Sequence, residues 1–342
     1  MKKNLITFIY SILFIMVIVS FVGCNKNSKD GRKGQVVVYA YDSFVSEWGP
    51  ASQLEKLFEE HSDYDLIFVS VGDAAQVLSK ATVERANPRA DVLLGIDNNL
   101  FEKAKYSMIL EPYVSHNLKD IPEHLLFDDK GTLSPYDWSN FAFIFNTKSD
   151  VPEPKSLLDL TNEVYNKKII LMDPRTSTPG LGFVAWTLSQ FGDAIVNYWY
   201  ALRPNILTMA PGWDTGYGLF TSGEAPLVIS YTTSPAYHAE YGETDQFKAL
   251  IFEEGHPYQV EGAGIVKRCK NPEGAKEFID FLLSEEAQSI LPLTQWMYPA
   301  NPNVALPESF NVAPKAKKNL SVDAKKLDNA LNEVIFMLNH AE

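Results

Sequence analysis

The chain has 342 residues, with 30 Lys and Arg against 43 Asp and Glu, and a net charge of −13. This length is enough for two ordinary domains with a sizeable core. The acidic balance argues against nucleic-acid binding and favours a small cationic ligand.

The N-terminus has the pattern of a targeting segment, which lies outside the fold argument. Two lysines precede an apolar run over residues 5–22, and Gly23 and Cys24 follow. A small residue before a cysteine at this place is how bacterial lipoprotein signals end. We therefore expect residues 1–23 to be a signal peptide and Cys24 to carry the lipid. An uncleaved transmembrane anchor is the alternative, since the run has about the minimum spanning length. Both interpretations place the folded part outside the cytoplasmic membrane.

The rest of the chain has little cysteine or histidine chemistry. Residues 24–34 are polar, so we expect a lipid-anchored flexible tether. The chain has two cysteines, Cys24 and Cys269. With Cys24 lipidated, Cys269 has no partner for a disulfide. The six histidines are scattered without the spacing of a zinc site, so we predict no metal site.

Short β-rich runs alternate with helical patterns after the tether, the strands falling at residues 36–41, 66–71 and 91–96. This alternation predicts a largely parallel, doubly wound sheet. The ligand end of such a sheet lies beyond the carboxyl ends of its strands. Acidic residues follow the three strands there, at Asp42, Asp73 and Asp97.

A very apolar strand at 141–146 is predicted to cross into a second lobe, where the α/β pattern restarts at residue 168. A glycine-broken strand at 260–266 and an amphipathic helix after it return the chain to the first lobe. A last helix is predicted over 322–339. The fold class is thus α/β with two lobes, each a doubly wound mixed sheet with flanking helices, and the ligand between them. The predicted division is 35–140 plus 258–292 for lobe 1 and 141–257 plus 293–342 for lobe 2.

A polar loop at 173–182, Asp-Pro-Arg-Thr-Ser-Thr-Pro-Gly-Leu-Gly, precedes an apolar helical run. A helix N-terminus has unpaired N–H groups and a partial positive charge, which suit an anion or a polar ligand group. The alternative is that Ser177 or Thr178 simply caps the helix.

Aromatic residues gather beside Gly, Ser, Thr and Pro at predicted strand ends and turns. Such faces bind flat heterocycles by stacking and cations through the ring quadrupole. Each aromatic alone is more often core packing, but five such segments together indicate a pocket for a flat cation. These segments lie at 41–44, 47–50, 212–218, 230–237 and 295–299.

Several of these motifs resemble the thiamine-binding subunit of bacterial ABC importers. They are Tyr-Asp-Ser-Phe followed by Trp-Gly-Pro (41–50), Ala-Asp-Val-Leu-Leu-Gly-Ile-Asp-Asn-Asn (90–99), the loop at 173–182, Ser-Tyr-Thr-Thr-Ser-Pro-Ala-Tyr (230–237) and Trp-Met-Tyr-Pro (296–299). The resemblance implies a type II periplasmic-binding-protein fold that closes over thiamine, thiamine monophosphate or thiamine diphosphate. It also implies a monomer without a catalytic residue or cofactor, and delivery of the ligand to an ABC permease and its ATPase.

Carried over by position, the resemblance implies an acidic residue near the cationic ligand at Asp73 and a phosphate or hydroxyl contact at Ser177. The remaining ligand-binding positions are aromatic: Tyr41, Trp48, Trp213, Tyr231, Tyr237 and Trp296. One alternative is the same fold binding ferric ion, a polyamine or another cationic nutrient. A second is an enzyme acting on a thiamine-like heterocycle, for which Cys269 is the one free thiol.

Overall fold

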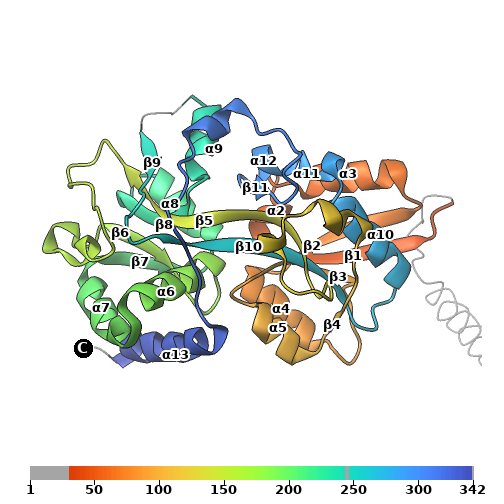
Figure 1. Cartoon of the computed structure of the whole chain (residues 1–342), viewed down its shortest axis with the longest axis horizontal. Coiled ribbons are helices and arrows are strands. Elements are labelled where there is room, and N and C mark those ends of the chain that lie inside the picture. Colours follow the sequence, from red (N-terminus) through yellow and green to blue (C-terminus); the bar gives the residue numbers. More distant parts are fainter. Residues whose placement is uncertain (1–30, 243–245, 341–342) are drawn as a thin grey trace, which may run out of the picture.

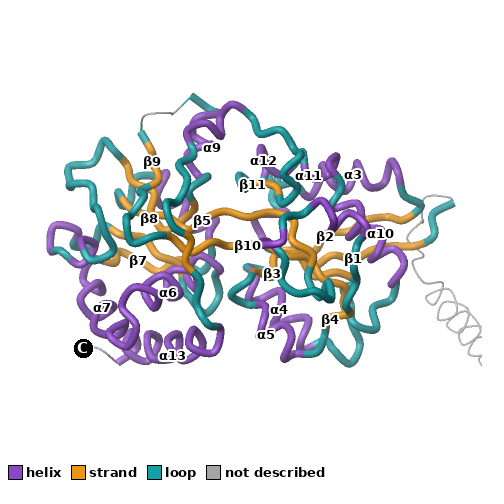
Figure 2. Tube along the Cα trace, viewed as in Figure 1, coloured by secondary structure: helices purple, strands orange, loops and turns teal. Residues whose placement is uncertain are grey.

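The computed structural model describes residues 31–242 and 246–340 as an α/β structure built on one long, curled sheet (Figures 1 and 2). The predicted signal peptide, Cys24 and most of the tether lie outside the described residues. No helix in the described ranges has both the length and the apolar character needed to cross a bilayer.

The sheet follows the order β2-β1-β3-β10-β5-β8-β6-β7. Its strands are β1 (Gly34–Ala40), β2 (Tyr64–Ser70), β3 (Val92–Asp97), β5 (Ser134–Asn146), β6 (Ile169–Met172), β7 (Ile206–Ala210), β8 (Leu227–Tyr231) and β10 (His256–Val266). Short strands add to this path: β4 (Leu110–Glu111), β9 (Phe247–Ala249), β11 (Tyr298–Pro299) and β12 (Asn319–Leu320).

Helices cover both halves of the sheet (Figure 1). On the half with β1 to β4, called lobe 1 below, lie α2 (Asp42–Val45), α3 (Ala51–His61), α4 (Ala74–Val83), α5 (Phe101–Ser107), α10 (Pro272–Leu282), α11 (Glu285–Gln288) and α12 (Leu291–Thr294). On the half with β6 to β9, called lobe 2, lie α6 (Thr178–Phe191), α7 (Ile195–Leu202), α8 (Trp213–Thr221), α9 (Ser234–Glu240) and α13 (Ala324–His340).

Two long antiparallel strands join the lobes through the middle of the molecule (Figure 1). Strand β5 pairs with β10 over Ser134 to Asn140 and with β8 from Phe141 onward. Strand β10 pairs with β3 on its other side. The strand predicted at 141–146 is therefore only the second half of β5. Its first half was missed because Tyr136, Asp137 and the polar residues after them interrupt the apolar pattern that identifies a buried strand.

The fold class was predicted correctly, with parallel pairing inside each lobe and antiparallel pairing at the crossing. In lobe 1, β1 lies parallel to β2 and β3. In lobe 2, β6 lies parallel to β7 and β8. Helix α4 ends at Val83, and Asp73 caps its start by accepting a hydrogen bond from Ala74 N–H at 2.7 Å.

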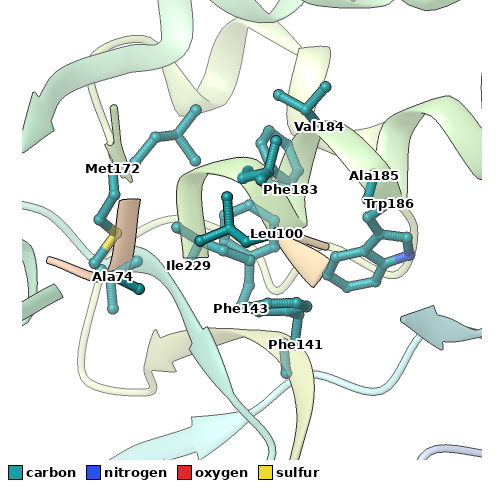
Figure 3. Close-up of a cluster of buried hydrophobic side chains, with 14 of the residues drawn as sticks. Ala74, Leu100, Phe141, Phe143, Met172, Phe183, Val184, Ala185, Trp186 and Ile229 are labelled. Atoms are coloured by element: carbon teal, nitrogen blue, oxygen red, sulfur yellow. The ribbon is translucent and has the colours of Figure 1, made fainter. Parts of the chain in front are cut away.

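A continuous buried cluster links the lobes beneath the sheet's ligand edge. Figure 3 shows Ala74 and Leu100, from lobe 1, in the same cluster as Phe143, Phe183 and Trp186 of lobe 2. The rings of Phe143 and Phe183 meet edge to face with their centroids 5.4 Å apart. Edge-to-face pairs add to the stabilisation from burial alone. Because the cluster holds residues of both lobes, the lobes are joined by buried apolar side chains as well as by the strands.

His256 begins β10 and is fully buried. Its Nδ1 lies 2.7 Å from the Phe141 carbonyl, and its Nε2 accepts the Phe252 N–H at 2.8 Å. These partners fix a neutral ring with the proton on Nδ1. Burial lowers the pKa of His256 to about 4, against 6.5 in an exposed histidine.

A lowered pKa in the folded state makes protonation favour unfolding, so this contribution to stability is lost as the pH falls from 6.5 to 4. We expect the free energy of unfolding of the wild type to fall by about 3 kcal/mol relative to His256→Gln across this range. Urea titrations at several pH values measure this difference. His124→Gln, at an exposed position, is the control. Parallel pH profiles for the wild type and His256→Gln would contradict the assignment.

Candidate functional site

A cleft of about 390 Å³ lies between the lobes and takes its walls from both of them. The lining includes the ends of β1 and β8, the starts of α4, α6 and α8, and the segment between α12 and β11. The aromatic members of the lining are Tyr41, Trp48, Trp213, Tyr217, Tyr231, Tyr237, Tyr241 and Trp296. The carboxylate members are Asp42, Asp73, Asp214 and Glu261.

The lobe 1 wall is built on Tyr41, directly after β1. Its ring packs edge to face on Phe44, with centroids 5.6 Å apart. Gly95 lies under the same ring with φ of +92°, and a Cβ there would come within 2.3 Å of the Tyr41 ring. Only glycine supplies both this conformation and this closeness. Trp48 lies at the cleft rim, 45% exposed.

The lobe 2 wall is built on Trp213, the first residue of α8. Its indole stacks on Tyr217 with centroids 4.8 Å apart, and its Nε1 donates to Ser230 Oγ at 2.8 Å. The hydrogen bond and the stacking fix the ring plane before any ligand binds. Trp213 also approaches Trp48 of lobe 1, with ring centroids 6.1 Å apart.

Tyr231 and Trp296 continue the aromatic lining. Tyr231, at the end of β8, stacks on Phe141 with centroids 5.4 Å apart. Trp296 meets Tyr237 edge to face at 5.3 Å. Its backbone has φ of +59°, a left-handed conformation that is rare for a bulky side chain and is typical of functional sites.

Asp73 brings a carboxylate from lobe 1 against two helix N-termini of lobe 2. Burial raises the pKa of Asp73, while hydrogen-bonding interactions with the Ala74 N–H, the Ser177 hydroxyl and the Trp213 and Thr178 N–H groups lower it. The Ser177 hydroxyl is buried and makes no hydrogen bond of normal geometry with any described residue. Ser177 occupies the N-cap position of α6 without capping it, which contradicts the simple capping interpretation for this residue.

Glu261, on the crossing strand β10, forms the floor of the cleft. One carboxylate oxygen accepts hydrogen bonds from Tyr41 Oη at 2.5 Å and from Tyr136 Oη at 2.6 Å. The other accepts from Gln259 Nε2 at 2.6 Å, and Gln259 in turn accepts from Tyr231 Oη at 3.0 Å. Burial is the main cause that raises the pKa of Glu261 to about 7.

The structure brings seven of the eight predicted site residues to one cleft: Tyr41, Trp48, Asp73, Trp213, Tyr231, Tyr237 and Trp296. Ser177 stands behind the lining, and its neighbour Thr178 reaches the cleft instead. Whether these residues bind a ligand stays a prediction.

The sequence interpretation missed Tyr136, Asp137, Gln259 and Glu261. The available signal was a carboxylate inside the apolar strand at 260–266, because an ionisable residue in a buried strand needs partners. Aromatic faces around partly buried carboxylates suit a flat cation, which stacks on the rings and compensates the negative charge. No group of His, Cys, Asp and Glu in the described part of the chain is arranged to hold a metal ion.

Two lobes joined by crossing strands, with an aromatic cleft between them, define a solute-binding protein of the type II periplasmic class. The chain belongs to the family described as bacterial extracellular solute-binding protein, whose sequence model matches residues 87–330.

Known periplasmic binding proteins align with this chain over most of their length, in agreement with this family. The chain is 39% identical to a thiamine-binding periplasmic protein of Brucella abortus, over 85% of this chain and 86% of the relative. It is 38% identical to a thiamine-binding periplasmic protein of Escherichia coli, over 84% and 87%. Among solved structures, a periplasmic thiamin binding protein matches with a TM-score of 0.83 at 35% identity, over 89% of this chain and 96% of that one.

The closeness of Gly95 to Tyr41 makes a direct test of how the cleft wall is built. Gly95→Ala should destabilise the protein by about 1–3 kcal/mol, because the new Cβ overlaps the Tyr41 ring and the backbone conformation is strained. Gly218→Ala is the matched control, since a Cβ at this helical position meets nothing within 4 Å. Chemical unfolding measures both. Equal stability of the two variants would show that Tyr41 moves away without cost.

Proposed function

We propose that this chain is the extracytoplasmic binding subunit of an ABC importer, and that it captures thiamine or its phosphate esters between its lobes. The observation that carries this proposal is the cleft itself, where rigid aromatic faces from both lobes surround the half-buried carboxylate of Asp73 and the buried carboxylate of Glu261. Thiamine has a flat pyrimidine and a cationic thiazolium ring, which match these two features. The names of the relatives support the same ligand class.

We further propose that the protein is anchored to the membrane and is not an enzyme. We propose a lipid on Cys24 that holds a monomer at the membrane, from which it delivers the ligand to a permease driven by an ATPase. Cys269 is half-buried, and burial raises the pKa of its thiol to about 11, so it is a poor nucleophile at neutral pH. This speaks against the enzyme alternative built on that thiol. Ferric ion and polyamines remain the comparison ligands for the binding assay.

Ligand identity is tested by titrating the protein that lacks residues 1–24 and following its tryptophan fluorescence. We expect saturable quenching by thiamine, its monophosphate or its diphosphate at micromolar or lower concentration, because Trp213 and Trp296 line the cleft. Ferric ion and spermidine are titrated in parallel. Saturation by either of these, with no response to the thiamine series from folded protein, would overturn the proposed ligand.

Trp213 provides the sharpest test of the aromatic wall. Trp213→Ala should lose about 1–3 kcal/mol of binding free energy, a roughly fivefold to 150-fold rise in Kd, because one stacking face is removed. Tyr106→Ala, at an exposed aromatic, is the matched control. Calorimetric titration gives both values. A Kd for Trp213→Ala equal to that of the control would remove Trp213 from the ligand contacts.

Ser177 distinguishes an anion subsite from a purely structural loop. Ser177→Ala should weaken phosphorylated ligands more than thiamine, since the hydroxyl and the α6 N-terminus together suit an anion. The measured quantity is the ratio of the Kd values for thiamine monophosphate and thiamine in wild type and variant. An unchanged ratio would make the role of Ser177 structural.

A further inference from the structure

A pair of carboxyl groups is buried on the two crossing strands, at the point where the lobes meet. Asp137 of β5 and Glu261 of β10 are direct partners in the antiparallel register, beside the irregularity between Glu261 and Gly262. Asp137 is fully buried, and Glu261 is 6% exposed at the cleft floor. No described Lys, Arg or His forms an ion pair with either carboxyl.

Counting donors and acceptors assigns the proton within this pair. Glu261 accepts three hydrogen bonds, from Tyr41, Tyr136 and Gln259. The Gln259 amide N–H can only donate, so Glu261 acts there as an acceptor. Neither oxygen of Asp137 has a hydrogen-bond donor among the described residues. Two buried ionised carboxylates on paired strand positions and without a cation are strongly unfavourable, so the pair holds one proton and it resides on Asp137.

The charges around the pair act in the same direction. Burial and then the negative charge of Glu261 raise the pKa of Asp137 well above its usual value. The groups facing Glu261 are the hydroxyls of Tyr41 and Tyr136, the Gln259 amide, and the like-charged Asp73 and Asp97. The tyrosines and Gln259 favour ionised Glu261, whereas Asp73 and Asp97 disfavour it.

Glu261, the ionised member of the pair, also connects the two aromatic walls through hydrogen bonds. Gln295 donates to Tyr41 Oη, Tyr41 to Glu261, Gln259 to Glu261, and Tyr231 to Gln259. The chain therefore runs from Tyr41 on lobe 1 to Tyr231 on lobe 2 through β10. Loss of the acceptor at Glu261 would remove the hydrogen bond of Tyr41 and the one that orients Gln259 toward Tyr231.

We propose that Asp137 and Glu261 form a proton-linked positioning element, which holds the two aromatic walls in place and gives up its shared proton when a cationic ligand enters the cleft. The bound cation takes over the role of the proton in compensating the negative charge, and the proton leaves to solvent. The cation in this proposal is the thiamine-class ligand, so this part rests on the proposed function.

The linkage predicts that affinity for thiamine rises with pH, by at most tenfold per pH unit, because deprotonation of the pair and cation binding favour each other. Calorimetric titrations in two buffers of different ionisation enthalpy count the protons released. We expect release in the wild type and in the control Asp193→Asn, an exposed position, and a smaller release in Asp137→Asn, in which only Glu261 of the pair still titrates. The asparagine side chain keeps the shape of Asp137 but cannot ionise. No release in the wild type, or equal release in Asp137→Asn, would overturn the linkage.

Tyr136→Phe keeps the proposal testable should Asp137→Asn fail to fold. Tyr136 donates to Glu261 and does not line the cleft. Removing this donor disfavours ionisation, so the pH profile of affinity should shift upward, by up to about one pH unit. A purely structural role would lower affinity equally at every pH, and this result would contradict the proposal.

A measurement on ligand-free protein separates this proposal from the identity of the ligand. The infrared difference spectrum between wild type and Asp137→Asn at neutral pH should contain the carbonyl band of a protonated carboxylic acid. Absence of the band would overturn the shared proton whatever thiamine does. The band together with no thiamine binding would overturn the proposed ligand and leave the shared proton supported.

Discussion

The antiparallel pairing of β5 with β10 is the constraint on which the rest of the structure depends. These strands pass from one lobe to the other, and each exchanges one partner strand for another on the way. The cleft floor is therefore made of hydrogen-bonded strands rather than of a loop. A side chain on this floor, such as Glu261, is held by backbone pairing; it contacts Tyr41 of lobe 1 directly and Tyr231 of lobe 2 through Gln259.

Burial of the carboxyl groups of Asp137 and Glu261 at the cleft floor costs free energy. Hydrogen bonds offset only part of this cost, so a cationic ligand can offset the rest. A charge removed from water costs several kcal/mol unless partners replace the lost hydration. Tyrosine hydroxyls and an amide replace part of it at Glu261, but no cationic side chain forms an ion pair with Glu261 in the described residues. The remaining negative potential lies among aromatic faces. A flat cation stacks on these aromatic faces and compensates the negative charge of the carboxyls. A neutral or anionic solute leaves that charge uncompensated.

Rigidity at the cleft comes from positions that are unusual in ordinary cores. Trp296 has a left-handed backbone, and Gly95 adopts a positive φ beneath the Tyr41 ring. Trp213 is fixed on one face by Tyr217 and at its Nε1 by Ser230. Side chains fixed before binding lose less entropy when the ligand arrives, so more of the contact energy appears as affinity.

The alternation of strands and helices determined the fold class, because a buried parallel sheet needs apolar strands and amphipathic helices in turn. Aromatic motifs at strand ends likewise identified six residues that line the cleft, and the family resemblance added Asp73. The sequence could not reveal the start of β5, the pairing of Asp137 with Glu261, or the position of Ser177 behind Thr178. These depend on strand register and on contacts between residues more than a hundred positions apart. Local pattern determines which segments form, whereas only tertiary packing decides which polar side chains meet and share a proton.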